Sequence, residues 1–205
     1  MDHDLSLAAH DLAPRRGGRV VAQGVSFSLV PGEALLLRGG NGAGKTSVLR
    51  AVAGLCPAGG GVAFARSGAP LDPAAARADA VHYLGAEEGL SARESPAETV
   101  RGWAALYGAS ARGALGEVGL AEQADMPCGA LSTGQRRRLG LARLLLAPRA
   151  LWLLDEPLSG LDEAGRTLFL SRIEGHRARG GLVLMASHEA GLPGAATLRL
   201  SEAAA

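Results

Sequence analysis

The chain has 205 residues, of which 47% are hydrophobic and 20% are charged, and its formal net charge is +1. A chain of this size buries enough apolar surface to fold as one domain, in one or two lobes, without metal or disulfide. The neutral charge balance argues against a nucleic-acid-binding protein. Residues 1–16 lack the apolar segment of a signal peptide, and no stretch reaches the ~20 apolar residues that span a bilayer. Cys56 and Cys128 lie far apart without metal-ligand spacing, which favours reduced thiols in a cytosolic protein.

Short apolar runs typical of strands alternate with amphipathic or capped segments typical of helices. Strands are expected within residues 25–30, 34–38, 80–85, 150–157 and 181–188, with shorter strands in the glycine- and proline-rich residues 56–74. Helices are expected within residues 46–55, 95–108, 111–124, 131–148 and 163–180. The first of these helices places four apolar side chains on one face: Val48, Leu49, Val52 and Leu55. Strand–helix alternation around a helical insert predicts a parallel α/β core with a helical subdomain.

Residues 39–46 match the phosphate-loop pattern G-x-x-x-x-G-K-[ST], between an apolar strand and an amphipathic helix. Glycines let backbone N–H groups point at phosphate oxygens, and the helix N-terminus adds a favourable dipole. Lys45 supplies a positive charge for the β and γ phosphates, and Thr46 supplies a hydroxyl for Mg²⁺. The residues expected to hold ATP are Gly39, Gly40, Asn41, Gly42, Ala43, Gly44, Lys45, Thr46 and Ser47. The alternative is a glycine-rich turn with a chance lysine.

Two acidic residues follow the apolar run 151–154 and stand where parallel sheets present their ligands, at the carboxyl end of a strand. Asp155 is expected to hold Mg²⁺, directly or through water. Glu156 points elsewhere and is expected to accept a proton from the water that attacks the γ phosphate. The alternative is a strand that ends in a solvated acidic turn.

The order of "LSTGQ", "RRRLGLARLLL" and "LLDEP" resembles the ATP-binding-cassette family, with Thr133 in place of the first glycine of the LSGGQ signature. The resemblance implies a P-loop NTPase fold with a RecA-like parallel core, an N-terminal antiparallel β subdomain and an inserted helical subdomain. The core would cover about residues 1–87 and 148–205, and the helical subdomain about residues 88–147. Taken alone, these stretches would be an ordinary helix cap and a solvated basic face or nucleic-acid patch.

In that family two cassettes pack head to tail, and the signature of one closes over ATP held by the other. The signature residues here are Leu131, Ser132, Thr133, Gly134 and Gln135. "SGLD" resembles the D-loop, with Ser159 and Asp162, and His188 stands where the family has a histidine that helps position Glu156 and the water. Glu87 stands at the position of the family's Q-loop glutamine, or Glu88 if the alignment shifts by one residue. Arg16 stands where the family stacks an aromatic residue on adenine.

Stretches such as "VHYLG" and "LWLLDEPLSGLD" are most similar to the ATP-binding subunits of bacterial haem exporters for cytochrome c maturation. This resemblance implies ATP and Mg²⁺ as ligands, a second copy of the chain, and separate transmembrane subunits at the cytoplasmic face of the inner membrane. No direct contact with nucleic acid is expected. The alternatives are another ABC importer or exporter ATPase, a soluble cassette acting on ribosomes or nucleic acid, and a small P-loop kinase, which leaves "LSTGQ" without a purpose.

Overall fold

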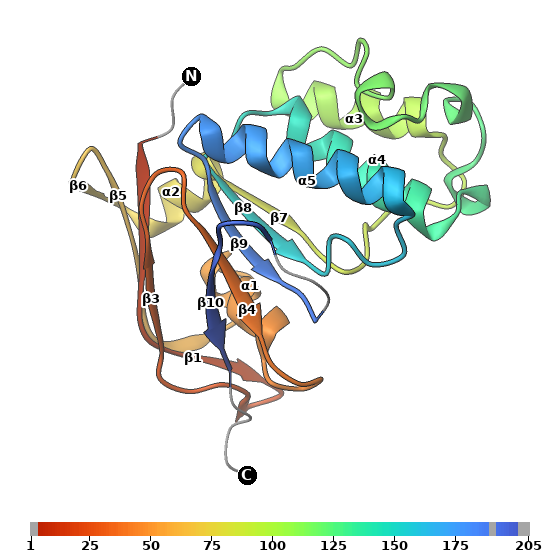
Figure 1. The fold of residues 1–205 in the computed structure, drawn as a ribbon. Helices are drawn as coiled ribbons and strands as arrows, with labels where there is room; N and C mark the ends of the chain where they lie inside the picture. The colour runs from red at the N-terminus through yellow and green to blue at the C-terminus, as the bar shows by residue number, and fades with distance from the viewer. Residues whose placement is uncertain (1–3, 189–191, 201–205) are drawn as a thin grey trace. The chain divides into compact units, whose positions relative to one another are not determined.

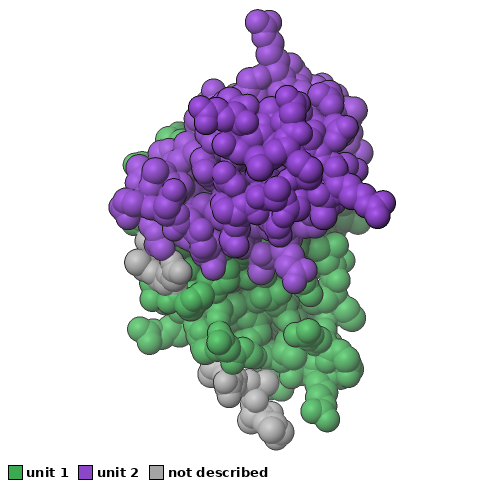
Figure 2. Space-filling view, turned by 90° about the vertical axis from the view of Figure 1, so that its right-hand side faces the viewer, with its two compact units in different colours: residues 1–85, 149–157, 173–205 green, residues 86–148, 158–172 purple. Residues whose placement is uncertain are grey.

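The computed structural model describes residues 4–188 and 192–200, and the chain divides into two compact units (Figures 1 and 2). Unit 1 comprises residues 1–85, 149–157 and 173–205, and unit 2 comprises residues 86–148 and 158–172. Parallel strands, antiparallel strands and a segment of helices are all present, so the predicted α/β class is confirmed. Helix α5 (Glu163–Ala178) begins in unit 2 and ends in unit 1.

The parallel sheet of unit 1 has the strand order β10-β4-β9-β8-β7. Its strands are β4 (Ala34–Arg38), β7 (Val81–Leu84), β8 (Leu151–Asp155), β9 (Leu182–Ala186) and β10 (Ala196–Arg199). Every residue of β8 and β9 is buried, which explains why their sequences are apolar without alternation. Because β4, β9 and β8 run in the same direction, their carboxyl ends meet at one edge of the sheet.

An antiparallel sheet in unit 1 joins β1 (Leu5–Arg16), β2 (Arg19–Val20), β3 (Val25–Leu29), β5 (Ala58–Arg66) and β6 (Ala69–Leu71). The long strand β1 was not among the predicted elements. Its alternation breaks because the register with β5 shifts between His10 and Ala13, and Asp11 has a φ of 46°. Gly60 lies opposite this bulge, where a Cβ would lie 2.3 Å from the carbonyl oxygen of Asp11.

Two helices cover the strands of unit 1. Helix α1 (Lys45–Val52) contacts β1 of one sheet and β8 and β9 of the other, so its apolar side chains join both sheets in one core. Helix α2 (Pro73–Ala80), which was not predicted, contacts β5 and β7. The prediction for Leu55 was wrong, because α1 ends before the left-handed Gly54 and the Leu55 side chain is 62% exposed.

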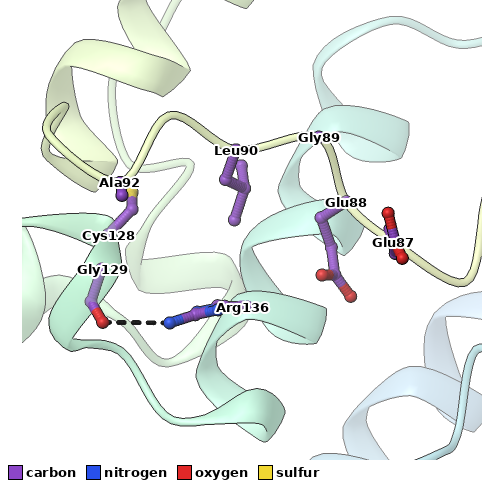
Figure 3. A pocket seen from close by; sticks show the side chains of 8 residues that line it. All are labelled: Glu87, Glu88, Gly89, Leu90, Ala92, Cys128, Gly129 and Arg136. Atoms are coloured by element: carbon purple, nitrogen blue, oxygen red, sulfur yellow. Dashed lines mark hydrogen bonds between the residues drawn. The ribbon is translucent and has the colours of Figure 1, made fainter.

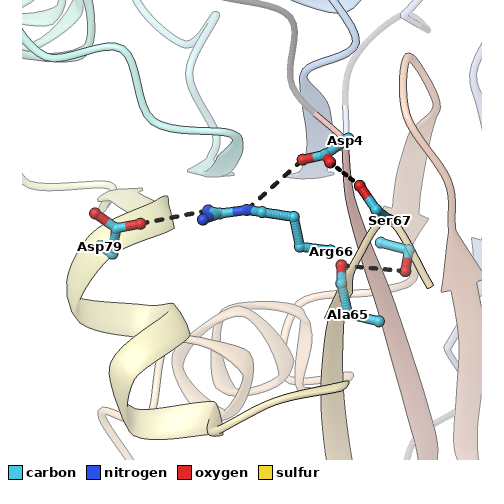
Figure 4. Close-up of polar contacts among 6 residues, drawn as sticks. Asp4, Ala65, Arg66, Ser67 and Asp79 are labelled. Carbon is cyan, nitrogen blue, oxygen red and sulfur yellow. Dashed lines mark hydrogen bonds and ion pairs between the residues drawn. The ribbon is translucent and has the colours of Figure 1, made fainter. Parts of the chain in front are cut away.

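A polar cluster on unit 1 links β5, α2 and the residue that precedes β1 (Figure 4). The Arg66 guanidinium, at the end of β5, lies 3.6 Å from Asp4 and 3.3 Å from Asp79 of α2. Ser67 donates a further hydrogen bond to Asp4. All three ion-pair partners are about half-exposed or more, so we expect a small contribution to stability, of about 0–1 kcal/mol for each pair.

Unit 2 is helical. It contains α3 (Pro96–Tyr107), α4 (Thr133–Leu146), the first part of α5, and the 3₁₀ turns η1 (Gly116–Val118), η2 (Ala121–Gln123) and η3 (Cys128–Ala130). The helix predicted over residues 111–124 is wrong, since only η1 and η2 form there. Gly113 and Gly119 have φ of 77° and 65° and interrupt a regular helix. Among the residues that the structure describes, no helix has the length and apolarity to cross a bilayer.

We expect Ser95→Ala to lower the free energy of unfolding by about 1 kcal/mol, because Ser95 and Glu98 cap α3 reciprocally. The measurement is urea unfolding, with the exposed Ser91 changed to Ala as the matched control, for which we expect a change within about 0.5 kcal/mol. The backbone N–H and hydroxyl of Ser95 lower the pKa of Glu98. The Glu98 carboxylate's part of the cap therefore contributes fully above the unfolded-state pKa of Glu98 and is lost as the pH falls through its lowered folded-state pKa. Equal stabilities of the two variants would contradict the cap's importance.

Candidate functional site

The predicted phosphate loop connects β4 to α1. Gly42 and Gly44 both have φ of 89°, a left-handed conformation that other residues rarely adopt. At Gly44 a Cβ would also lie 2.8 Å from the carbonyl oxygen of Val21, so the loop has no space for a larger residue there. The backbone therefore needs glycine at this position of the pattern.

The Lys45 ammonium lies against the inside of this loop. Its Nζ donates hydrogen bonds to the carbonyl oxygens of Gly39 at 2.8 Å and Gly40 at 3.0 Å, and the residue is 9% exposed. Lys45 is also the only lysine in the chain, since 20 of its 21 basic residues are arginines. The one compact ammonium group among the basic side chains therefore lies in the phosphate loop, and all other basic side chains are the larger, planar guanidinium groups.

The two predicted magnesium ligands lie together, although they are far apart in the sequence. The Thr46 hydroxyl donates to Asp155 Oδ1 at 3.1 Å, and Asp155 is 2% exposed. A hydroxyl beside a buried carboxylate is a hard-oxygen donor set that suits Mg²⁺. No group of three or more His, Cys, Asp and Glu residues that could hold a metal occurs in the described part of the chain. Mg²⁺ in nucleotide sites commonly takes its further ligands from substrate phosphates and water.

Glu156 and His188 also lie together. His188 Nδ1 lies 3.0 Å from Glu156 Oε1, and the His188 backbone N–H donates to Glu156 Oε2 at 3.4 Å. Glu156 has a φ of 49°, and its backbone N–H donates to Ala186 of β9 at 2.9 Å. The two adjacent carboxylates therefore have different partners: Asp155 contacts the Thr46 hydroxyl, and Glu156 contacts the ring and backbone N–H of His188.

Two residues near Asp155 were not among the predicted site residues. Tyr83, the penultimate residue of β7, interacts with Asp155, and Arg50 of α1 donates to the Tyr83 hydroxyl at 3.4 Å. Burial raises the pKa of Tyr83, and the negative charge of Asp155 raises it further. The phenol therefore keeps its proton beside the carboxylate. No sequence motif marks Tyr83, because its place depends on the pairing of β7 with β8.

Arg16 lies at the exposed end of β1, where the chain turns at Gly17 and Gly18 into β2. The chain then passes Val21, whose carbonyl oxygen lies against Gly44. The hairpin that carries Arg16 therefore leads directly to the phosphate loop, within unit 1.

In unit 2 the signature residues form the start of α4. Ser132 accepts a hydrogen bond from the Gln135 backbone N–H at 3.1 Å, and the Gln135 side chain accepts from the Ser132 backbone N–H at 2.8 Å. Leu131 is buried and anchors the turn that precedes the helix. The Ser132 and Gln135 side chains are thus engaged in capping the helix, and this fixes the start of α4.

The signature and D-loop segments touch each other within unit 2. A Cβ on Gly134 would lie 2.8 Å from the carbonyl oxygen of Gly160, and one on Gly160 would lie 2.9 Å from Thr133 Cγ2. Asp162 accepts from the Gly165 backbone N–H at 2.8 Å and so caps α5, while Ser159 is half-buried beside Gly160. Thr133, the departure from the family signature, therefore packs its methyl group against the D-loop segment.

The segment with Glu87 borders a hollow of about 290 Å³ in unit 2 (Figure 3). Its lining residues are Glu87, Glu88, Gly89, Leu90, Ala92, Cys128, Gly129 and Arg136. Glu87 is exposed, whereas Glu88 pairs with Arg137 at 2.9 Å and has 12% of its side chain exposed. Of the two candidates for the Q-loop position, Glu87 is the one whose carboxylate has solvent access.

Cys56 and Cys128 are both free thiols and form no disulfide, as the sequence predicted.

The phosphate loop, the acidic strand end and the signature point to one family. A family model described as "ABC transporter" matches residues 22–159, which is more than half of the chain. The chain belongs to the ABC transporter family. Relatives from Paramagnetospirillum magneticum and Hyphomonas neptunium are 44% and 43% identical, and both are named "Cytochrome c biogenesis ATP-binding export protein CcmA". The alignments cover 97% and 95% of this chain and 95% and 96% of the relatives.

Solved structures agree with the ABC transporter fold. A Pyrococcus furiosus protein described as an ABC transporter ATP-binding protein has a TM-score of 0.79 at 22% identity, over 95% of this chain and 97% of that one. A structure described as an ATP-binding subunit of an ABC transporter has a TM-score of 0.75 at 26% identity, over 89% and 79%. The predicted P-loop NTPase fold and the family resemblance are therefore confirmed.

We expect Gly134→Ala to destabilise this ABC protein, although alanine normally favours a helix by about 0.5–1 kcal/mol over glycine. The reason is that the new methyl group would collide with the Gly160 carbonyl. The matched control is Gly102→Ala in α3, where a Cβ meets nothing within 4 Å, and which should be more stable than the parent. Urea unfolding measures both variants. Equal stabilisation of the two would show that the Gly134–Gly160 contact is loose.

Proposed function

We propose that this chain binds and hydrolyses ATP as the ATPase subunit of an export complex for cytochrome c biogenesis, with haem as its cargo. One observation carries the enzymatic part. Within unit 1, the Thr46–Asp155 pair and the Glu156–His188 pair stand at the same sheet edge as the phosphate loop. The names of the relatives from P. magneticum and H. neptunium support the cytochrome c part of the proposal.

The phosphate loop would bind the triphosphate through its backbone N–H groups, with Lys45 moving from the Gly39 and Gly40 carbonyls to phosphate oxygens. Thr46 and Asp155 would hold Mg²⁺, whose chemistry there is to neutralise charge on the β and γ phosphates. Arg16, at the end of its hairpin, would lie over the adenine, since a guanidinium plane stacks on rings.

Glu156 would act as the general base. A water molecule in line with the γ phosphate would pass its proton to the Glu156 carboxylate as the terminal phosphate bond breaks. His188 would hold that carboxylate in place, because its ring and its backbone N–H contact both oxygens of Glu156. In the role of the family's Q-loop glutamine, Glu87 would bring a negative charge, and hydrolysis would be slower or more dependent on Mg²⁺.

A second copy of the chain would complete the site. We propose that the residues at the start of α4, 131–135, close over ATP bound to the other copy, and that Ser159 and Asp162 lie at that interface. The capped start of α4 supports this proposal, because its first-turn N–H groups and dipole favour an anion. Separate transmembrane subunits would receive the closing movement, and the chain would lie at the cytoplasmic face of the inner membrane. An ABC transporter with another cargo is the alternative, and the membrane subunit that co-purifies with the chain distinguishes the two.

We expect Glu156→Gln to lower ATP turnover by about 10²–10⁴-fold, because the amide cannot accept the proton from water. ATP binding should persist, and a closed dimer should accumulate with Mg²⁺ and ATP. Turnover, nucleotide binding and size-exclusion chromatography measure the three outcomes. The matched control is Glu174→Gln on the exposed part of α5, with unchanged turnover expected. Normal turnover of Glu156→Gln would exclude the general-base role.

We expect Lys45→Ala and Lys45→Arg both to abolish most ATP binding or turnover, because the loop fits a compact ammonium. Since Lys45 is the only lysine, an amine-selective reagent modifies only this side chain and the N-terminal amine. Mg²⁺ and ATP should protect Lys45 and leave the N-terminal amine reactive, as mass spectrometry can measure. Equal labelling of Lys45 with and without ATP would contradict the phosphate-loop role.

A further inference from the structure

Three consecutive arginines of α4 bind three different segments of unit 2. Arg136 donates to the carbonyl of Gly129 at 3.0 Å, and Arg138 donates to the carbonyl of Gly119 at 2.9 Å. Arg137 donates to the carbonyl of Ala86 at 2.9 Å. The run "RRR" is therefore a set of internal contacts, whereas a solvated basic face would point these side chains at water.

Arg137 differs from its two neighbours because it is buried and also binds a carboxylate. It is 4% exposed, and its second terminal nitrogen lies 2.9 Å from Glu88 Oε1. The partners in these contacts, Ala86 and Glu88, flank Glu87 on either side in the sequence. Glu87 itself is exposed. The Arg137 guanidinium thus contacts the residues on both sides of the exposed Glu87.

The chemistry of the pair favours a fixed geometry. One terminal nitrogen donates a directional hydrogen bond to the Ala86 carbonyl and the other forms the ion pair with Glu88, so the two contacts together favour one placement of residues 86–88 against α4. A buried charge that loses its partner is strongly unfavourable, so movement of the segment away from Arg137 is costly. The Glu88 carboxylate is occupied by this pairing, which leaves position 87 as the one carboxylate that the segment presents.

We propose that Arg137 is a positioning residue that holds Glu87 at a fixed place on the signature helix α4. Glu87 and the signature start, Ser132–Gln135, then move as one piece whenever α4 moves. What Glu87 does in hydrolysis rests on the proposed function, but the fixing of residues 86–88 by Arg137 does not. The Arg137 guanidinium holds the segment through the backbone carbonyl of Ala86 and the carboxylate of Glu88.

Hydrogen exchange on the full-length chain tests the fixing itself. In Arg137→Met and in Glu88→Gln, the amides of residues 86–90 should exchange at least about tenfold faster, because the local opening that exposes them costs less free energy. The matched control is Glu117→Gln, which removes an exposed ion pair with Arg172 in the same unit and should leave residues 86–90 unchanged. Unchanged exchange of residues 86–90 in Arg137→Met and Glu88→Gln would overturn the proposal. If Arg137→Met does not fold, Glu88→Gln decides alone.

A double-mutant cycle tests whether Arg137 acts through Glu87. ATP turnover is compared in the parent, Glu87→Ala, Arg137→Met and the double variant, at saturating Mg²⁺ and ATP. A positioning role predicts that Arg137→Met lowers turnover in the parent but no further once Glu87 is alanine. The same fractional loss in both backgrounds would overturn it. An inactive parent protein would instead refute the proposed function. Hydrogen exchange would still test whether Arg137 fixes residues 86–88.

Discussion

The site depends on the register of three parallel strands, β4, β9 and β8. Ala186 of β9 pairs with Leu37 on one side and with Asp155 on the other, so these three residues form one row across the sheet. The phosphate loop, His188 and Glu156 each follow within a few residues of that row. Because side chains alternate between the faces of a sheet, a shift of one residue in β8 would send Asp155 to the face away from Thr46. The buried ladder thus sets the distances between groups from three distant parts of the chain.

Local strain within unit 1 serves the same arrangement. Glu156 adopts a left-handed conformation that a non-glycine residue rarely tolerates, and the hydrogen bond to Ala186 holds it there. Without this turn, adjacent residues in an extended strand would point to opposite faces, and Glu156 would lie away from the His188 backbone. Gly44 fixes the backbone of the phosphate loop in a similar way, since its left-handed conformation and its contact with Val21 leave no space for a side chain. The geometry of the candidate site is therefore held partly by backbone conformations that most residues rarely adopt.

In unit 2 the helix α4 has a comparable organising role. Its start carries the signature and touches the D-loop segment at Gly160, while its three arginines bind the segments at residues 86–88, 118–119 and 129. The helix α4 therefore connects these segments of unit 2 to one another. The basic run is consequently a structural feature of the fold and adds little to the exposed charge.

The sequence by itself determined the features that depend on neighbouring residues. These are the phosphate loop, the buried strands β4, β8 and β9, and the capped helices α3 and α4, because spacing, caps and apolar runs act locally. Only the tertiary structure decided the features that depend on distant contacts. It showed the bulged strand β1 opposite Gly60, the lack of a regular helix over residues 111–124, and the exposure of Leu55. It also distinguished Glu87 from Glu88. Only Glu88 pairs with Arg137, and this contact joins residues that are about fifty positions apart in the sequence, so it forms only when the chain folds.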